Sequence, residues 1–155
     1  MAQAAENPVV QQKRLIIPNK YGEKLVGLLH DTGSVEIVIL CHGFQATKEY
    51  RIMTNVAGAL EKEGISAFRL DFSGNGESEG TFECGNYKKE ADDLHAVIEH
   101  FSGANHVISG ILGHSKVKDS RIMMRDLQIT KKRKKPSDLT SSVGHGAVLS
   151  FSRRS

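Results

Sequence analysis

One serine in the chain lies in a sequence context that could make it a nucleophile. Ser115 follows Gly113 and His114, and this triplet comes directly after the apolar run 107–112. A serine hydroxyl is a poor nucleophile until a neighbouring base takes its proton. A sharp strand-to-helix turn exposes such a hydroxyl and leaves the next backbone N–H, here that of Lys116, free to bind an oxyanion. The segment therefore predicts a nucleophilic serine on a tight turn.

A second segment could supply the other half of an oxyanion site. His42, Gly43 and Phe44 follow another apolar run. Two backbone N–H groups aimed at one point stabilise a tetrahedral oxyanion, and the Phe44 N–H can meet the Lys116 N–H there. For His42 we favour a structural role, in which the ring satisfies backbone groups of the loop, over the role of catalytic base. The same structural interpretation is favoured for His114.

The segments around these turns alternate between strand-like and helix-like patterns. Nearly continuous apolar runs are typical of strands buried on both faces, and apolar positions spaced by three and four are typical of helices. Turn-forming residues between the first two segments predict an antiparallel hairpin. The patterns predict hairpin strands at 13–17 and 24–29, buried strands at 35–40, 65–70 and 107–112, and helices at 53–60 and 87–101.

This order of elements predicts an α/β fold with a parallel sheet and right-handed crossovers. We expect Gly64 to stop the first helix, Asn86 to cap the second and Gly103 to follow its end. Ligands on such sheets bind at the carboxyl ends of the strands. The loops after 35–40 and 107–112 carry the residues considered above, so both sets meet at one edge of the sheet.

A third loop at that edge is rich in glycine and acidic residues. It begins at Asp71, contains Gly74 and Gly76, and ends at Gly80. It lacks the Lys-Ser/Thr ending of a nucleoside-triphosphate loop, and no helix begins directly after its glycines. We therefore expect a tight turn that packs beside the serine.

The charge of the chain changes abruptly after Lys116. Residues 1–116 hold 11 basic and 15 acidic side chains, a net charge of −4, whereas residues 117–155 hold 10 and 3, a net charge of +7. The basic run Lys131–Lys135 has no aromatic residues among its charges, so we favour solvated charge over nucleic-acid binding. We expect disorder over much of 131–155.

The remaining composition is that of an ordinary soluble protein of one domain. No apolar run spans a bilayer, and the first residues do not form a secretory signal, so no membrane partner is expected. Cys41 and Cys84, the two cysteines, predict free thiols in a reducing compartment, hence a cytoplasmic protein. Neither has a second Cys or His at ligand spacing, so no metal is expected.

Together these segments resemble the α/β-hydrolase superfamily, in particular its plant serine aminopeptidase and carboxylesterase-like branch. The matching segments are 41–44, 68–80 and 111–116, and the resemblance covers about 13–116, the N-terminal half of such a fold. It implies a partial α/β-hydrolase fold with a basic, irregular C-terminal tail. It also implies hydrolysis of small ester or amide substrates without a cofactor, in which Ser115 resembles the nucleophile and Phe44 and Lys116 the oxyanion donors.

The chain beyond Ser115 departs from the family pattern. The family orders its triad as serine, acid and histidine, and Asp138 and His145 follow in that order but on no predicted strand. Val117 stands where the serine turn has its last glycine, and a branched side chain leaves no room for close packing there. We therefore expect a truncated or alternatively spliced product with a hydrolase half at 13–116 and a non-family tail at 117–155. Such a chain is expected to be catalytically impaired.

Such a half-domain has a structural consequence. The strand 107–112 would become an exposed edge of the sheet, which predicts marginal stability or self-association through that edge. Two other functions stay open from the sequence. One is a non-catalytic hydrolase-like fragment that binds a ligand or partner, and the other is a basic-tailed nucleic-acid or nuclear interactor.

Overall fold

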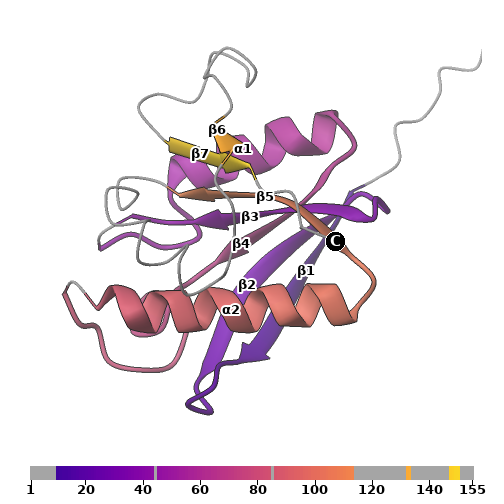
Figure 1. Cartoon of the computed structure of the whole chain (residues 1–155). Helices are drawn as coiled ribbons and strands as arrows, with labels where there is room; N and C mark the ends of the chain where they lie inside the picture. The colour runs from indigo at the N-terminus through magenta and orange to yellow at the C-terminus, as the bar shows by residue number, and fades with distance from the viewer. Residues whose placement is uncertain (1–9, 44, 85, 114–131, 134–146, 151–155) are drawn as a thin grey trace, which may run out of the picture.

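The computed structural model describes residues 10–43, 45–84, 86–113, 132–133 and 147–150. These residues form one sheet of strand order β1-β2-β4-β3-β5-β7-β6, with two helices packed on it (Figure 1). The strands are β1 (Gln11–Pro18), β2 (Lys24–Asp31), β3 (Glu36–Cys41), β4 (Ser66–Leu70), β5 (Val107–Gly113), β6 (Lys132–Arg133) and β7 (Ala147–Ser150). The helices are α1 (Arg51–Lys62) and α2 (Tyr87–Gly103).

The predicted hairpin and parallel strands are confirmed. β1 and β2 pair antiparallel, and β2 continues the sheet antiparallel to β4. β3 lies between β4 and β5 and is parallel to both. The fold is therefore α/β, with three parallel strands joined by crossover helices after an N-terminal hairpin, as the alternating patterns predicted.

The two helices cover opposite faces of the sheet, as Figure 1 shows. Alternate residues of a strand point to opposite faces. Ile37 and Ile39 of β3 accordingly pack in one core with α2, whereas Leu40 packs in a second core with α1. The helix faces are apolar at the spacing of three and four that predicted them, with Leu94, Val97 and Phe101 of α2 buried in the first core.

An extra residue interrupts the pairing of β3 with β5. Ile37 pairs with Ile108, but Val38 pairs with Gly110, so the register shifts between them. Ser109 is the residue left over, and its hydroxyl lies 3.4 Å from the Ile37 carbonyl oxygen. This is a β-bulge, which the sequence analysis did not anticipate although a glycine inside a strand pattern can signal one.

The ends of the helices agree with the sequence at two of three positions. Gly64 has φ +72° and follows Glu63, the C-cap of α1, at the stop predicted for it. Asn86 caps α2, since its side chain accepts a hydrogen bond from the Lys89 backbone N–H at 3.2 Å. Gly103, expected beyond the end of α2, is instead its last residue. The left-handed turn that reverses the chain falls two residues later on Asn105, with φ +62°, a residue type that tolerates this conformation.

The expectation of a bare edge at 107–112 is wrong for its second half. β7 pairs antiparallel with β5 from Gly110↔Ser150 to Gly113↔Ala147, and β6 pairs with β7. β7 therefore covers the edge at 110–112, and self-association through that part of the strand loses its basis. Lys132 and Arg133 of the basic run belong to β6, where disorder was expected. The boundary at 116–117 stays a prediction.

Replacement of Gly27 tests the packing of the sheet. A Cβ added at Gly27 would lie 2.0 Å from the Phe68 ring and 2.8 Å from the Arg69 carbonyl oxygen. Because neither neighbour can move without disturbing β4, we expect Gly27→Ala to lower the free energy of unfolding by about 2 kcal/mol. Urea denaturation followed by circular dichroism measures this change.

Gly58 supplies the matched control. It lies in α1, and a Cβ added there meets no atom within 4 Å. Gly58→Ala should stabilise the chain by up to about 1 kcal/mol through helix propensity. Equal effects of the two substitutions would contradict the packing described for β2 and β4.

Candidate functional site

The carboxyl ends of three strands lie side by side. Cys41, the last residue of β3, pairs with Leu70 at the end of β4 and with Gly113 at the end of β5. The loops that begin at His42 and Asp71, together with the end of β5, therefore share one edge of the sheet, as the sequence predicted. Phe44, His114, Ser115 and Lys116 lie outside the described residues, so their proposed roles stay predictions.

His42 is fixed in place by the backbone on both sides of its ring. It is 1% exposed. Its Nε2 accepts a hydrogen bond from the Phe72 N–H at 3.1 Å, and its Nδ1 lies 2.8 Å from the Gly43 carbonyl oxygen. A neutral imidazole has one N–H, so the ring that accepts at Nε2 donates from Nδ1. These contacts are of the kind that the structural role favoured for His42 requires.

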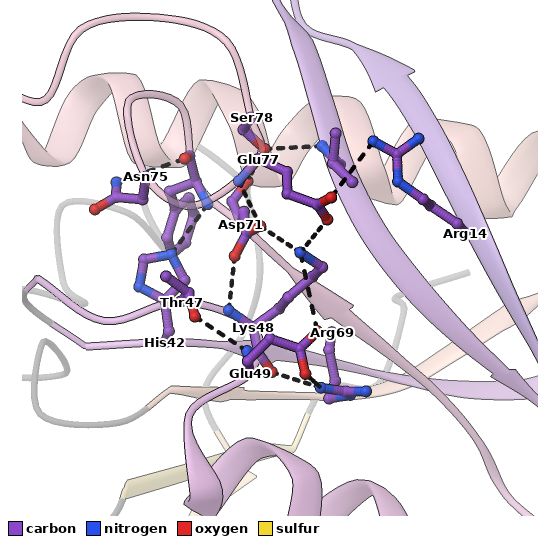
Figure 2. A network of polar contacts seen from close by, with 12 residues as sticks. Arg14, His42, Thr47, Lys48, Glu49, Arg69, Asp71, Asn75, Glu77 and Ser78 are labelled. Carbon is purple, nitrogen blue, oxygen red and sulfur yellow. Dashed lines mark hydrogen bonds and ion pairs between the residues drawn. The ribbon is translucent and has the colours of Figure 1, made fainter.

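The loop after β3 is short and tightly turned. The Ala46 N–H donates to the Gly43 carbonyl at 3.3 Å. Gln45, between them, has φ +51°, a left-handed conformation that is uncommon for a residue with a side chain. At the far end, the Lys48 N–H donates to Asp71 Oδ1 at 2.7 Å, as Figure 2 shows.

A buried ion pair joins this loop to the loop after β4. Lys48 Nζ lies 2.7 Å from Asp71 Oδ2 and 2.6 Å from Glu77 Oε2 (Figure 2). Asp71 is fully buried and the Lys48 side chain is 5% exposed, whereas Glu77 is half exposed. Burial alone would lower the pKa of Lys48, but the two carboxylates outweigh it and raise that pKa above its ordinary value. The hydrogen bond from Lys48 lowers the pKa of Glu77.

The glycines of the 71–80 loop are required by this arrangement. Gly76 has φ +52°, and a Cβ there would lie 2.4 Å from Asp71 Oδ2. Gly74 has φ +79°, and a Cβ there would lie 2.4 Å from the Phe82 backbone nitrogen. The loop is thus a tight turn around a carboxylate, as expected. Its Ser78 hydroxyl donates to the Asp71 carbonyl oxygen at 2.7 Å, which closes the turn.

A second buried network reaches the same loop from the sheet. Arg69 of β4 is 4% exposed. Its Nη1 donates to the Lys48 carbonyl at 2.7 Å and its Nε donates to His30 Nε2 at 2.9 Å. The other ring nitrogen of His30 contacts the Glu61 carboxylate of α1. The network therefore ties β2, β4, α1 and the loop after β3 together.

A second buried carboxylate holds the other side of the 71–80 loop. Asp93 of α2 accepts hydrogen bonds from the Ser73 N–H and the Asn19 side-chain amide, both at 2.9 Å. Burial raises the pKa of Asp93, and these hydrogen bonds oppose that rise. The hairpin, the loop and α2 therefore meet at one carboxylate.

Sequence reasoning missed Lys48, Arg69 and Asp93. A lysine in a polar loop, an arginine in a strand and an aspartate on a helix each resemble solvated charge. Only Arg69 carried a signal, because it interrupts an otherwise apolar run that reads as a strand buried on both faces. A charge at such a position has to find a buried partner.

The described part of the chain offers no group of three metal-ligating side chains. Neither α1 nor α2 is long and apolar enough to cross a membrane. Cys41 is buried and Cys84 is exposed, and no disulfide joins them.

Comparison with known protein families gives a match that includes the loops at this edge. The family model described as serine aminopeptidase, S33, matches residues 33–116. The chain belongs to this family. The match ends one residue after Ser115 and includes all three loops at the carboxyl edge. No curated protein matches the sequence, and nothing supports the plant branch that the resemblance implied.

Solved structures that resemble the chain are esterases and related hydrolases. The esterase Pf2001 of Pyrococcus furiosus is 28% identical, with a TM-score of 0.62 over 68% of this chain and 41% of its own. Est1E of Butyrivibrio proteoclasticus, solved with ferulic acid bound, is 27% identical, with a TM-score of 0.62 over 72% and 48%. XC6422 of Xanthomonas campestris, an α/β serine hydrolase without a lid, is 24% identical, with a TM-score of 0.63 over 76% and 57%, and shows the fold alone. The chain thus spans about half the length of these structures.

Removal of the His42 ring tests its structural role. His42→Ala leaves the Phe72 N–H without its acceptor and opens a void among buried side chains. We expect the free energy of unfolding to fall by about 3 kcal/mol. His95→Ala, at an exposed histidine of α2 that pairs with Glu99, should change it by less than about 0.5 kcal/mol. Urea titrations of both variants measure the difference, and similar values would contradict the role given to His42.

Glu77 makes the stability of the loops depend on pH. Its pKa is lower in the folded chain than the ordinary value of 4.5. Its contribution is therefore present above pH 4.5 and is lost as the pH falls through the folded pKa. We expect the urea midpoint of wild type to exceed that of Glu77→Gln near pH 7, and the gap to close below that window. Glu36→Gln, at the exposed first residue of β3, is the matched control for the loss of one carboxylate.

Proposed function

We propose that the carboxyl edge of β3 and β5 carries the nucleophile and oxyanion half of a serine hydrolase site for small esters or amides. Ser115 is the proposed nucleophile, and the backbone N–H groups of Phe44 and Lys116 are the proposed oxyanion donors. The observation that carries the proposal is the pairing of Cys41 with Gly113. It brings the start of the loop that contains Phe44 and the strand that leads to Ser115 together at one edge. Membership of the serine aminopeptidase family and the likeness to two esterases support the same chemistry.

The proposed reaction passes through an acyl-enzyme. The Ser115 Oγ bonds to the substrate carbonyl carbon, the hydroxyl proton passes to a base, and the carbonyl oxygen becomes an oxyanion held by two N–H groups. The bond to the alcohol or amine then breaks as that group takes up a proton. Water attacks the acyl-enzyme, which releases the acid and restores the serine.

The described residues at this edge do not supply the base. His42 uses Nε2 to accept the Phe72 N–H, and Asp71 is occupied by Lys48 and by the Glu77 N–H. After Ser115 the sequence contains one histidine, His145, two residues before β7. We propose that this chain by itself is catalytically impaired, because the described residues at this edge supply no base for Ser115. The family match ends at residue 116, where the basic tail begins, and supports this proposal.

Labelling with a fluorophosphonate probe tests both parts of the proposal. We expect Ser115 to be labelled, because oxyanion donors retain part of the reaction rate when a triad member is missing. Labelling should be slower than that of a complete esterase such as Pf2001 by roughly three orders of magnitude or more. Intact-mass spectrometry measures the rate. Ser115→Ala should abolish labelling, and His145→Ala should leave the slow rate unchanged.

Two outcomes contradict the proposal in different ways. Loss of labelling in His145→Ala would mean that the chain provides its own base, which overturns the impairment. A wild-type chain that is not labelled at all, although folded by circular dichroism, would favour the alternative of a non-catalytic hydrolase-like fragment that binds a ligand or partner.

A further inference from the structure

We infer that Lys48 is a positioning residue that fixes the loop between β3 and α1 at its far end, and so sets where the proposed oxyanion donor of that loop stands. The inference rests on the proposed function, because the loop matters for chemistry only if Phe44 donates to an oxyanion. Lys48 itself lies at the end of the loop and is not proposed to touch substrate.

The loop is held at two points, both on the residues that directly follow β4. At its start, His42 accepts the Phe72 N–H, and its Nδ1 contacts the Gly43 carbonyl. At its end, the Lys48 N–H donates to Asp71 Oδ1. Phe72 and Asp71 are neighbours in the chain, so both ends of the loop are hydrogen-bonded to two adjacent residues. We infer that these two anchors restrict the backbone between them.

Three separate groups of Lys48 make the second anchor. Its N–H and its Nζ bind the two oxygens of the Asp71 carboxylate, both at 2.7 Å, and its carbonyl accepts from Arg69 Nη1 at 2.7 Å. Figure 2 shows these contacts converging from the loop, from β4 and from the 71–80 loop. A lysine that merely satisfied a buried carboxylate would need only its ammonium group. Here the same carboxylate also fixes the backbone at that residue.

The conformation of Gln45 is consistent with a loop that is held from outside. Its φ of +51° is unfavourable for a residue with a side chain. Such conformations persist where the surrounding structure over-determines them. Thr47, the residue before Lys48, accepts two hydrogen bonds from residues after it. Its hydroxyl accepts the Glu49 N–H at 3.2 Å, and its backbone carbonyl accepts the Tyr50 N–H at 3.0 Å. The anchor at Lys48 thus leads directly into the start of α1.

The experiment compares amide hydrogen exchange and fluorophosphonate labelling in the full chain. Lys48→Met removes the ammonium but keeps the length of the side chain, and Lys48→Arg keeps a charge on it. Lys13→Met is the matched control, because Lys13 pairs with Asp31 at 2.9 Å on the exposed side of the hairpin. Exchange is read for the segment 42–48 and, as a reference for the overall fold, for the buried part of α2 at 94–101.

We expect Lys48→Met to speed exchange in 42–48 by about tenfold while 94–101 keeps its wild-type rate. Labelling of Ser115 should slow by about ten- to a hundredfold, because a small displacement of a donor costs that much. Lys48→Arg should recover most of both losses, and Lys13→Met should match wild type. If Lys48→Met also loosens 94–101, the double variant Lys48→Met/Asp71→Asn is used instead, since it leaves no unpaired buried charge.

Three results would overturn the inference. Unchanged exchange in 42–48 would mean that Lys48 does not hold the loop. Faster exchange with unchanged labelling would mean that the anchor has no bearing on the oxyanion donor. Full loss in Lys48→Arg as well as in Lys48→Met would point to packing alone. A wild-type chain that is never labelled overturns the proposed function instead, and exchange in 42–48 then decides whether Lys48 holds the loop.

Discussion

The carboxylate of Asp71 has to be satisfied without water, and much of the carboxyl edge is arranged around that requirement. It receives the Lys48 ammonium and two backbone N–H groups, those of Lys48 and Glu77. A buried carboxylate with fewer partners would cost several kcal/mol by a rough estimate. The loops after β3 and β4 are therefore held to each other through one side chain, and the glycine at 76 leaves the space that this side chain occupies.

The sheet and the polar networks have different roles at this edge. Parallel pairing of β3 with β4 and β5 decides which loops are neighbours. The apolar cores on the two faces fix the helices, and Phe72 of the loop after β4 packs in the core that α2 covers. Buried polar side chains add further connections: Arg69 and His30 connect the loop after β3 to α1, and Asp93 connects the loop after β4 to α2. Each loop is consequently tied to the helix on its own side of the sheet.

The spacing of apolar residues and the residue types at turns were sufficient to predict the α/β architecture from the sequence. The strands, both helices, the hairpin and the shared edge of the three loops follow from apolar spacing and from glycine and asparagine at turns. The partners of Lys48, Arg69 and Asp93 could not be predicted, because a buried ion pair between distant loops leaves no periodic pattern. The strand β7 on the edge of β5 was missed for a related reason. Four residues in a basic, serine-rich segment carry too little pattern to reveal a pairing with a distant strand.

The bulge at Ser109 decides which way the end of β5 faces. In a regular strand Ile108 and Ile111 would point to opposite faces, since they are an odd number of residues apart. Both nevertheless pack against the core that α2 covers, because the extra residue restores their phase. Residues 110–113 therefore follow a side-chain alternation shifted by one position from that of 107–108. A single additional residue in mid-strand thus lets both ends of β5 bury an isoleucine in the same core.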